Sequence, residues 1–483
     1  MPRLTIWQGI FLYIIILSCL KTFVYGSREL QAVSKPNYDY YHSSKALYDD
    51  VDKLGKQYPE IIQIKNERLV NGSYTILIKV VSYEHPHPFP TKTEPPKLAR
   101  ILMNCGEHGR ELVTSEFCLE LLRTILDPDR LLSAVAGDAI RARRLAALLQ
   151  QTQIQMIPLQ NPGGRDKVER GKLCERKNGR GVDTNRNWSL DWGKKEKDYN
   201  PDEEYPGDGP FSEPETKLLL GLAQKMKPQV WLNIHSGMAA MFVPWDHRDT
   251  VAQTVTPSLE ILKTVHSEIM DGTDCVVGAG GKMVGYLAHG TATDFMHGVL
   301  KIPFSYTWEI FGDFSAPFED CFRAFNPLSE DSLKEVINRW IRAFLRTLEL
   351  MPSHEAFSGS AFAAAARQPV DKLPLLSDFL VLSAKEGKGG SNSTNKALSS
   401  PNSSSSSSSS TSPYLPPLTP VPYDSITASR NRVAEKLALL RKEKSRGMNT
   451  SWGVILCLAV LIVAFVFIVR VLRGPPWSGG KWW

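Results

Sequence analysis

The sequence predicts an α/β fold, and three stretches support that prediction. Residues 101–103 form a short apolar run that ends near a glycine, as a buried strand does where it reaches a turn. Over residues 113–125, large apolar side chains recur every fourth position, which is the buried stripe of an amphipathic helix. A further apolar run, 230–234, predicts a second strand. Strand-like and helix-like patterns alternate from about residue 38 to 351, which favours one core of mixed elements.

Both ends of the chain carry targeting signals. An apolar run follows Arg3 and gives way to small residues, which predicts a signal peptide over residues 1–27. Residues 453–472 are almost wholly apolar and, although short, predict one transmembrane helix followed by a tail, 473–483. A basic juxtamembrane segment, 430–450, precedes that helix. We therefore expect a membrane-anchored protein of the secretory pathway or plasma membrane.

Topology and the boundary of the folded body follow from the same patterns. More Lys and Arg precede the span than follow it, and charge bias alone would place the body in the cytoplasm. The signal peptide outweighs this bias, because long domains cross the membrane largely regardless of charge. We expect the body, 36–352, to be lumenal or extracellular. Residues 353–429 are rich in Ser, Pro and Ala, which predicts a low-complexity stalk.

Composition excludes some classes of function. The 483 residues are 42% hydrophobic and 22% charged, enough for a large core. The net charge of +6 is spread widely and no basic patch with interleaved aromatic residues occurs, so we expect no nucleic-acid partner. We also expect a monomeric body. The five cysteines outside the signal and the span allow at most two disulfides and one thiol. Five Asn-x-Ser/Thr triplets predict a glycoprotein, although Asn187 directly follows a candidate site residue and should be unmodified.

A candidate metal motif lies between the first strand and its helix, in the sequence NCGEHGREL. On a helical turn His108 and Glu111 would share a face and could direct an imidazole and a carboxylate at one ion. A catalytic zinc needs a third ligand, and His235 follows the strand 230–234 beside two small residues. Two alternatives stay open at this point: Glu111 suits the opening of a helix, and His235 suits a structural hydrogen bond.

Three further stretches carry side chains typical of a binding or catalytic site. Arg176, Asn185 and Arg186 lie close together, and clustered Arg with Asn is suited to holding carboxylates. Tyr286 lies in a glycine-rich loop. Glu309 lies on an expected strand among apolar neighbours, which raise a carboxyl's proton affinity and suit a general base.

Taken together, these motifs resemble the zinc metallocarboxypeptidase family, which includes the A/B digestive and D/E/M regulatory enzymes, over residues 38–351. The resemblance implies a mixed, twisted β-sheet flanked by helices. It also implies one Zn²⁺ per chain, held by His108, Glu111 and His235. The other implied roles are Glu309 as general base, Arg176 as oxyanion stabiliser, and Asn185, Arg186 and Tyr286 as the residues that bind the substrate's terminal carboxylate. Arg110 matches a subsidiary substrate contact, or it is a helix-surface arginine.

The implied activity is the removal of single C-terminal residues from peptides or proteins. Two alternatives remain: an inactive binder of C-terminal carboxylates, and a hydrolase of acylated amino acids. For specificity, the resemblance points to Asp246, eleven residues after His235, where regulatory relatives place an acid that would favour Lys or Arg. The competing position, Thr293, is neutral. His247 and Arg248, which follow Asp246 at once, could neutralise its charge as a surface pair.

Overall fold

The computed structural model describes residues 33–86, 97–197, 199–317 and 319–376, and these build a mixed sheet covered by helices. The sheet has eight strands in the order β1-β2-β4-β3-β5-β8-β6-β7. Their bounds are β1 Ile62–Asn71, β2 Tyr74–Tyr83, β3 Ala99–Asn104, β4 Thr152–Ile157, β5 Val230–His235, β6 Met238–Val243, β7 Val276–Ala279 and β8 Phe304–Phe311. The predicted strands at 101–103 and 230–234 are confirmed.

The central strands run parallel, as do β6 and β7 at one edge, and the other flanking pairs are antiparallel. β4, β3, β5 and β8 are parallel neighbours, whereas β1 with β2, β2 with β4, and β6 with β8 are antiparallel. The expected mixed sheet flanked by helices is therefore confirmed. Because parallel strands share one carboxyl edge, the segments that follow β3, β5 and β8 emerge side by side.

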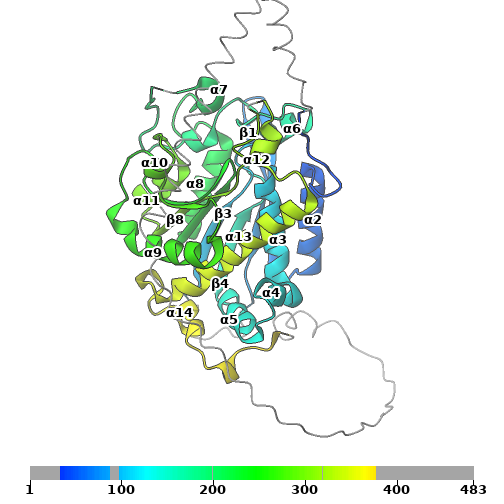
Figure 1. Cartoon of the computed structure of the whole chain (residues 1–483), viewed down its shortest axis with the longest axis vertical. Helices are drawn as coiled ribbons and strands as arrows, with labels where there is room; N and C mark the ends of the chain where they lie inside the picture. The colour runs from blue at the N-terminus through cyan, green and yellow to red at the C-terminus, as the bar shows by residue number, and fades with distance from the viewer. Residues whose placement is uncertain (1–32, 87–96, 198, 318, 377–483) are drawn as a thin grey trace, which may run out of the picture. The chain divides into compact units, whose positions relative to one another are not determined.

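Helices cover both faces of the sheet (Figure 1). They are α2 Ser44–Gln57, α3 Leu112–Leu126, α4 Pro128–Ala134, α5 Ala139–Leu149, α6 Pro162–Glu169, α7 Pro201–Glu204, α8 Pro214–Met226, α9 Thr256–Val265, α10 Gly280–Met283, α11 Ala292–Gly298, α12 Cys321–Phe325, α13 Glu330–Leu350 and α14 Ala361–Ala366. Strand alternation divides the apolar residues between the faces: Ile101 and Met103 belong to the larger cluster, and Leu102 to the smaller one.

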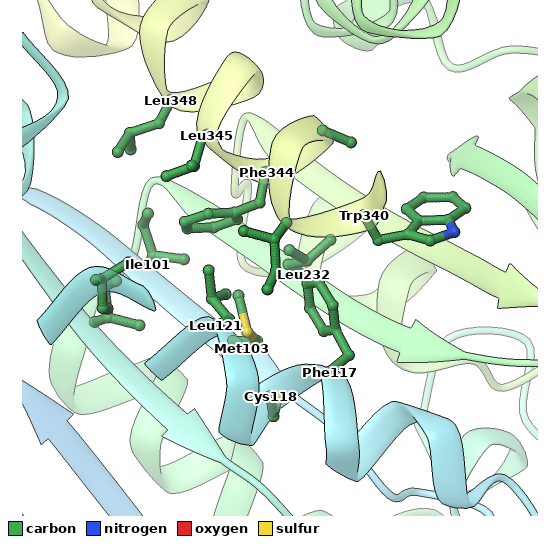
Figure 2. Packing of buried hydrophobic residues seen from close by; sticks show 14 of the residues in the cluster. Ile101, Met103, Phe117, Cys118, Leu121, Leu232, Trp340, Phe344, Leu345 and Leu348 are labelled. Carbon is green, nitrogen blue, oxygen red and sulfur yellow. The ribbon is translucent and has the colours of Figure 1, made fainter. Parts of the chain in front are cut away.

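The larger cluster packs α3 and α13 onto the central strands. Figure 2 shows Phe117 and Leu121 of α3 close to Leu232 of β5, with Phe344 of α13 next to them. The sequence of α13 dictates this contact, because its buried side chains recur at intervals of three or four residues, from Leu333 to Leu348. The smaller cluster packs α8 and α11 onto the opposite face.

The folded body extends beyond the predicted boundary at residue 352. Phe357, Phe362 and Leu373 are buried in the larger cluster, so the expectation that the stalk begins at 353 is wrong. Its Ala-rich stretch forms α14, because alanine is the best helix former and Phe362 supplies an apolar anchor. The rest of the predicted stalk, the signal peptide, the basic segment and the span 453–472 lie outside the described residues. Within the described ranges, no helix is long and apolar enough to cross a membrane.

Two disulfides link segments near the candidate metal motif to helices. Cys105 bonds to Cys118, which ties the end of β3 to α3, and Cys174 bonds to Cys321, which ties the segment before Arg176 to α12. Cys275 is a buried free thiol. The limit of two disulfides and one thiol is confirmed; the pairing depends on chain contacts that the sequence did not reveal.

Candidate active site

The chain leaves β3 through a tight turn that brings His108 and Glu111 together. Gly106 has φ 65°, and a Cβ there would lie 2.9 Å from the Oγ of Ser115, so only glycine fits this close approach. Helix α3 begins at Leu112, and Glu111 is its N-cap residue. The two side chains converge because the Glu111 amide donates to the carbonyl of His108 at 3.2 Å. Our expectation that His108 and Glu111 share a helical face is therefore wrong, although the two side chains do lie close together.

His108, Glu111 and His235 form a buried cluster with metal-ligand geometry. The Nδ1 of His108 lies 2.7 Å from Oε1 of Glu111 and 3.1 Å from Nδ1 of His235, which in turn lies 3.2 Å from Oε2 of Glu111. In a tetrahedral zinc site with bonds of about 2.0–2.1 Å, ligand atoms lie roughly 3.3–3.4 Å apart. Among the described residues, no other group of three such side chains converges in this way. The donor set and its spacing fit a zinc ion.

Each histidine meets a buried carboxylate on its other ring nitrogen. The Nε2 of His108 lies 3.2 Å from Asp183, and the Nε2 of His235 lies 3.2 Å from Glu107. A proton on Nε2 leaves Nδ1 free to bind metal, so these carboxylates fix the ring orientation and tautomer that a metal site needs. Sequence reasoning missed both residues. Glu107 directly precedes the first ligand and Asp183 opens DTNRNW, so an acid adjoining each motif was the available signal.

The buried carboxylates of this cluster are ionised. Burial acts to raise the pKa of Glu111, but the charges of His108 and His235 outweigh it and hold that pKa well below its usual range. Burial likewise opposes ionisation of Asp183, and Arg176 and His108 reverse the effect. A carboxylate must be deprotonated to bind a cation, so the site keeps its acidic ligand ready.

Glu309 lies beside the cluster in a different electrostatic state. It pairs with His235 in the register of β5 and β8, and its Oε2 is buried without a hydrogen-bond partner among the described residues. Burial raises its pKa to about 7, and the Glu111 charge adds to this, although His235 opposes it. A pKa near neutrality suits a group that takes and returns a proton. A bound divalent cation would lower this pKa.

Three arginines surround the cluster, and each has a carboxylate partner. Arg176 donates to Asp183 at 2.8 Å and lies 3.3 Å from the Nδ1 of His108, so it faces the metal-ligand cluster. Arg186 pairs with Glu204 and Arg110 pairs with Glu203, both on α7. Arg110 is buried against the ring of Phe325, so it is not a helix-surface arginine.

Asn185 and Tyr286 reach the same region from two loops. The Oδ1 of Asn185 accepts from the amide of Ala292 at 2.9 Å, which leaves its NH₂ group as the donor end. Tyr286 lies between α10 and α11, where burial raises its pKa and the charges of Arg186 and Arg176 oppose the shift. Gly290 lets this loop pack closely, because a Cβ there would lie 2.5 Å from the carbonyl oxygen of Arg186.

The candidate specificity residue, Asp246, has a different neighbour from the one expected. The Nδ1 of His247 pairs with Asp294 at 2.5 Å, so the expectation that His247 neutralises Asp246 is wrong. Asp246 instead accepts from the hydroxyl of Thr291 at 2.8 Å. Burial and the charge of Asp294 raise the pKa of Asp246 to about 8. Its carboxyl is therefore largely neutral at pH 7.

The competing position, Thr293, lies on α11 and is hydrogen-bonded to two strands of the sheet. Its hydroxyl accepts from the indole of Trp231 at 3.1 Å and lies 2.6 Å from the hydroxyl of Thr307.

The side-chain amide of Asn187 is buried and hydrogen-bonded. It donates to the carbonyl of Pro206 at 2.8 Å and to the hydroxyl of Ser212 at 2.9 Å. Burial of this amide supports the expectation that the triplet at Asn187 carries no glycan.

Comparison with known proteins decides the family. A family model described as zinc carboxypeptidase matches residues 47–334. The chain belongs to the zinc carboxypeptidase family. Similar curated proteins include carboxypeptidase O from Bos taurus, 25% identical over 57% of this chain and 71% of that protein. Human carboxypeptidase O is 24% identical over 62% of this chain and 79% of that protein. The chain is thus a metallocarboxypeptidase, a hydrolase.

Solved structures share the fold. Thrombin-activatable fibrinolysis inhibitor superposes with a TM-score of 0.51 at 18% identity, covering 65% of this chain and 75% of that one. The carboxypeptidase A of Helicoverpa armigera gives a TM-score of 0.51 at 19% identity, covering 71% of this chain and 78% of that one. At such identities the likeness confirms the α/β architecture and leaves substrate preference to the residues of the site.

Loss of one ligand tests the metal site. The purified full chain should bind one zinc per molecule, and His235→Ala should lose it, because two protein ligands hold zinc far more weakly than three. Elemental analysis after dialysis measures the metal directly. As a control, His354→Ala removes an imidazole elsewhere in the body and should retain the zinc. Full zinc content in His235→Ala would contradict the ligand assignment.

Proposed function

We propose that this protein is a zinc-dependent, membrane-anchored carboxypeptidase that removes single residues from the C-termini of peptides or proteins. The observation that carries the proposal is the buried His108, Glu111 and His235 cluster with Glu309 beside it in the register. Zinc bound by these three ligands would polarise the scissile carbonyl and make water a better nucleophile. Membrane anchoring and the lumenal or extracellular location rest on the two sequence segments outside the described residues.

Glu309 is the proposed general base. Its unpaired Oε2 accepts a proton from the attacking water and later gives that proton to the leaving amine. Arg176 stabilises the negative charge that develops on the carbonyl oxygen, because Asp183 holds its guanidinium in place facing the cluster. Each of these groups is positioned before substrate arrives, which lowers the reorganisation needed in the reaction.

The terminal carboxylate of the substrate would bind Arg186, Asn185 and Tyr286. An arginine and an amide NH₂ group match the acceptors of a carboxylate, and the tyrosine hydroxyl adds a third donor. A carboxylate bound at this position beside the metal-ligand cluster would place the terminal peptide bond at the zinc, as an exopeptidase requires. Arg110 would contact the substrate further from the terminus.

The two alternative functions lack support of their own. An inactive binder would be expected to lack a ligand or the base, whereas His108, Glu111, His235 and Glu309 are all present. A hydrolase of acylated amino acids could use the same zinc chemistry. Arg110, before α3, and Arg176, on the loop before α7, would extend the site beyond one residue, which favours longer substrates.

Turnover with and without the base tests this proposal. The full chain should release C-terminal amino acids from a peptide panel, and a chelator should stop the release. Glu309→Gln keeps the size of the side chain but cannot accept the proton, so kcat should fall by roughly two to four orders of magnitude while zinc stays bound. Unchanged turnover in this variant would mean that another group is the base. Faster release from N-acyl amino acids than from peptides would favour the amide hydrolase.

Asp246 makes a preference for Lys or Arg dependent on pH. Its pKa, raised to about 8, means that the carboxyl gains its charge as the pH rises through that value. The ratio of kcat/KM for peptides ending in Arg to those ending in Leu should therefore increase between pH 6.5 and 8.5. Asp246→Asn has no charge to gain, so its ratio should stay flat. A preference for Leu at every pH, or an Arg preference that survives the substitution, would exclude Asp246 as the determinant.

A further inference from the structure

Two of the three site arginines are paired with carboxylates on a helix that none of the predicted motifs includes. Glu204 of α7 accepts from Arg186 at 2.8 Å. Its neighbour Glu203 contacts Arg110 through both oxygens, at 2.7 and 3.1 Å. A four-residue segment thus places an anion on each arginine that the proposed function assigns to substrate binding.

Hydrogen bonds other than the ion pairs hold α7 in this place. Asn200 caps its first turn by accepting from the amide of Asp202 at 3.0 Å. Lys177 donates to the carbonyl of Pro201 at 3.2 Å, and the amide of Asp183 donates to the carbonyl of Tyr205 at 2.8 Å. The helix is therefore fixed at both ends to the loop that carries Arg176 and Arg186. This attachment keeps Glu203 and Glu204 next to their arginine partners.

The pairs differ in how easily the carboxylate can leave. Asp183, the partner of Arg176, has no exposed side-chain surface, so separating that pair would strand a buried charge. The Glu204 side chain is 25% exposed, whereas that of Arg186 is only 9% exposed. The partly exposed Glu204 carboxylate can therefore leave its partner at lower cost than Asp183 could. Arg186 is more deeply buried, so a replacement anion would stabilise it when Glu204 leaves.

A substrate carboxylate is a better partner for Arg186 than Glu204 is. The bond to Glu204 uses one nitrogen of the guanidinium, and a second donates to the carbonyl of Asn185 at 3.0 Å. A terminal carboxylate at this position would gain the amide of Asn185 and the hydroxyl of Tyr286 as well. The exchange replaces one bond with a set of three donors.

We propose that Glu204 is a resident counter-ion that occupies Arg186 until the terminal carboxylate of a substrate displaces it. Glu204 is a positioning residue: it keeps the guanidinium compensated and aligned in the free enzyme, and the exchange sets the affinity for C-terminal carboxylates. The inference rests on the proposed function, because it takes Arg186 as the carboxylate anchor. It adds a competitor for that anchor within the chain itself.

Binding of a peptide with a free C-terminal carboxylate, compared with its C-terminal amide, tests the exchange without requiring turnover. The zinc-loaded full chain carrying Glu309→Gln provides the background, and titration calorimetry gives both Kd values. Adding Glu204→Gln removes the competing charge but keeps the size of the side chain. The Kd of the peptide acid should fall by roughly three- to tenfold, which corresponds to about 0.7–1.4 kcal/mol, and that of the amide should not change.

Kinetics supply the second readout. In the otherwise unaltered enzyme, Glu204→Gln should lower KM for the peptide acid by a similar factor and leave kcat within about twofold, because uniform binding changes KM alone. Asp202→Asn is the matched control: it removes the same charge from an exposed position on the same helix, and both constants should stay as they are.

Each other outcome has a distinct meaning. Weaker binding of the acid by Glu204→Gln would overturn the proposal, since Glu204 would then be a permanent support for Arg186. Unchanged binding of the acid would overturn it too, because no exchange would take place. If the parent background binds the acid no better than the amide, Arg186 is not the anchor, and the proposed carboxylate site fails together with this inference. If Glu204→Gln tightens binding of the acid in the Glu309→Gln background, but the protein with Glu309 intact shows no turnover, the exchange is supported and the proposed catalysis is contradicted.

Discussion

The parallel register of β3, β5 and β8 is the constraint on which the site depends. It places Glu309 opposite His235 at one edge of the sheet, and the turn after β3 delivers His108 and Glu111 to that edge. Buried amides lock the register directly beneath: Asn104 donates to Asn233 at 2.9 Å, and Asn233 donates to Glu107 at 2.7 Å. A slip of one residue would turn His235 and Glu309 to the opposite face.

Charge compensation is the second constraint. The site holds three arginines, Arg110, Arg176 and Arg186, and five paired carboxylates, Glu107, Glu111, Asp183, Glu203 and Glu204. Protonated imidazoles balance this set without a metal, whereas neutral, metal-binding imidazoles leave two more negative than positive charges. A divalent cation would then restore the balance, because unpaired buried charges are costly. The raised pKa of Glu309 and of Asp246 limits any further accumulation of negative charge.

The sequence predicted those parts of the site that local pattern controls. Two strands were predicted from continuous apolar runs, one before His108 and one ending at His235. The helix after Glu111 was predicted from the spacing of its apolar residues. The boundary at 352 failed because an Ala-rich stretch resembles a linker until Phe357 and Phe362 are seen to pack into the core. His247 was paired with the wrong acid because sequence proximity favoured Asp246 over Asp294.

Contacts between distant segments were beyond the reach of the sequence. Asp183 lies 75 residues from His108, and only the fold brings them together. The role of Glu203 and Glu204 on α7 could not be predicted for the same reason. The sequence PDEE is typical of a solvated helix start, and the role of the two acids depends on which arginines they contact in the fold. Site chemistry of this kind follows from topology, and a single sequence without an alignment carries little information about it.

An anomalous difference map recorded at the zinc absorption edge tests the central claim most directly. The claim is that one dication completes both the ligand geometry and the charge balance of this edge of the sheet. It predicts a single strong peak per chain, at about 2.0–2.2 Å from the Nδ1 atoms of His108 and His235 and from the carboxylate of Glu111. A map from zinc-supplemented crystals without a peak at these atoms, or with its main peak at other residues, would contradict the account.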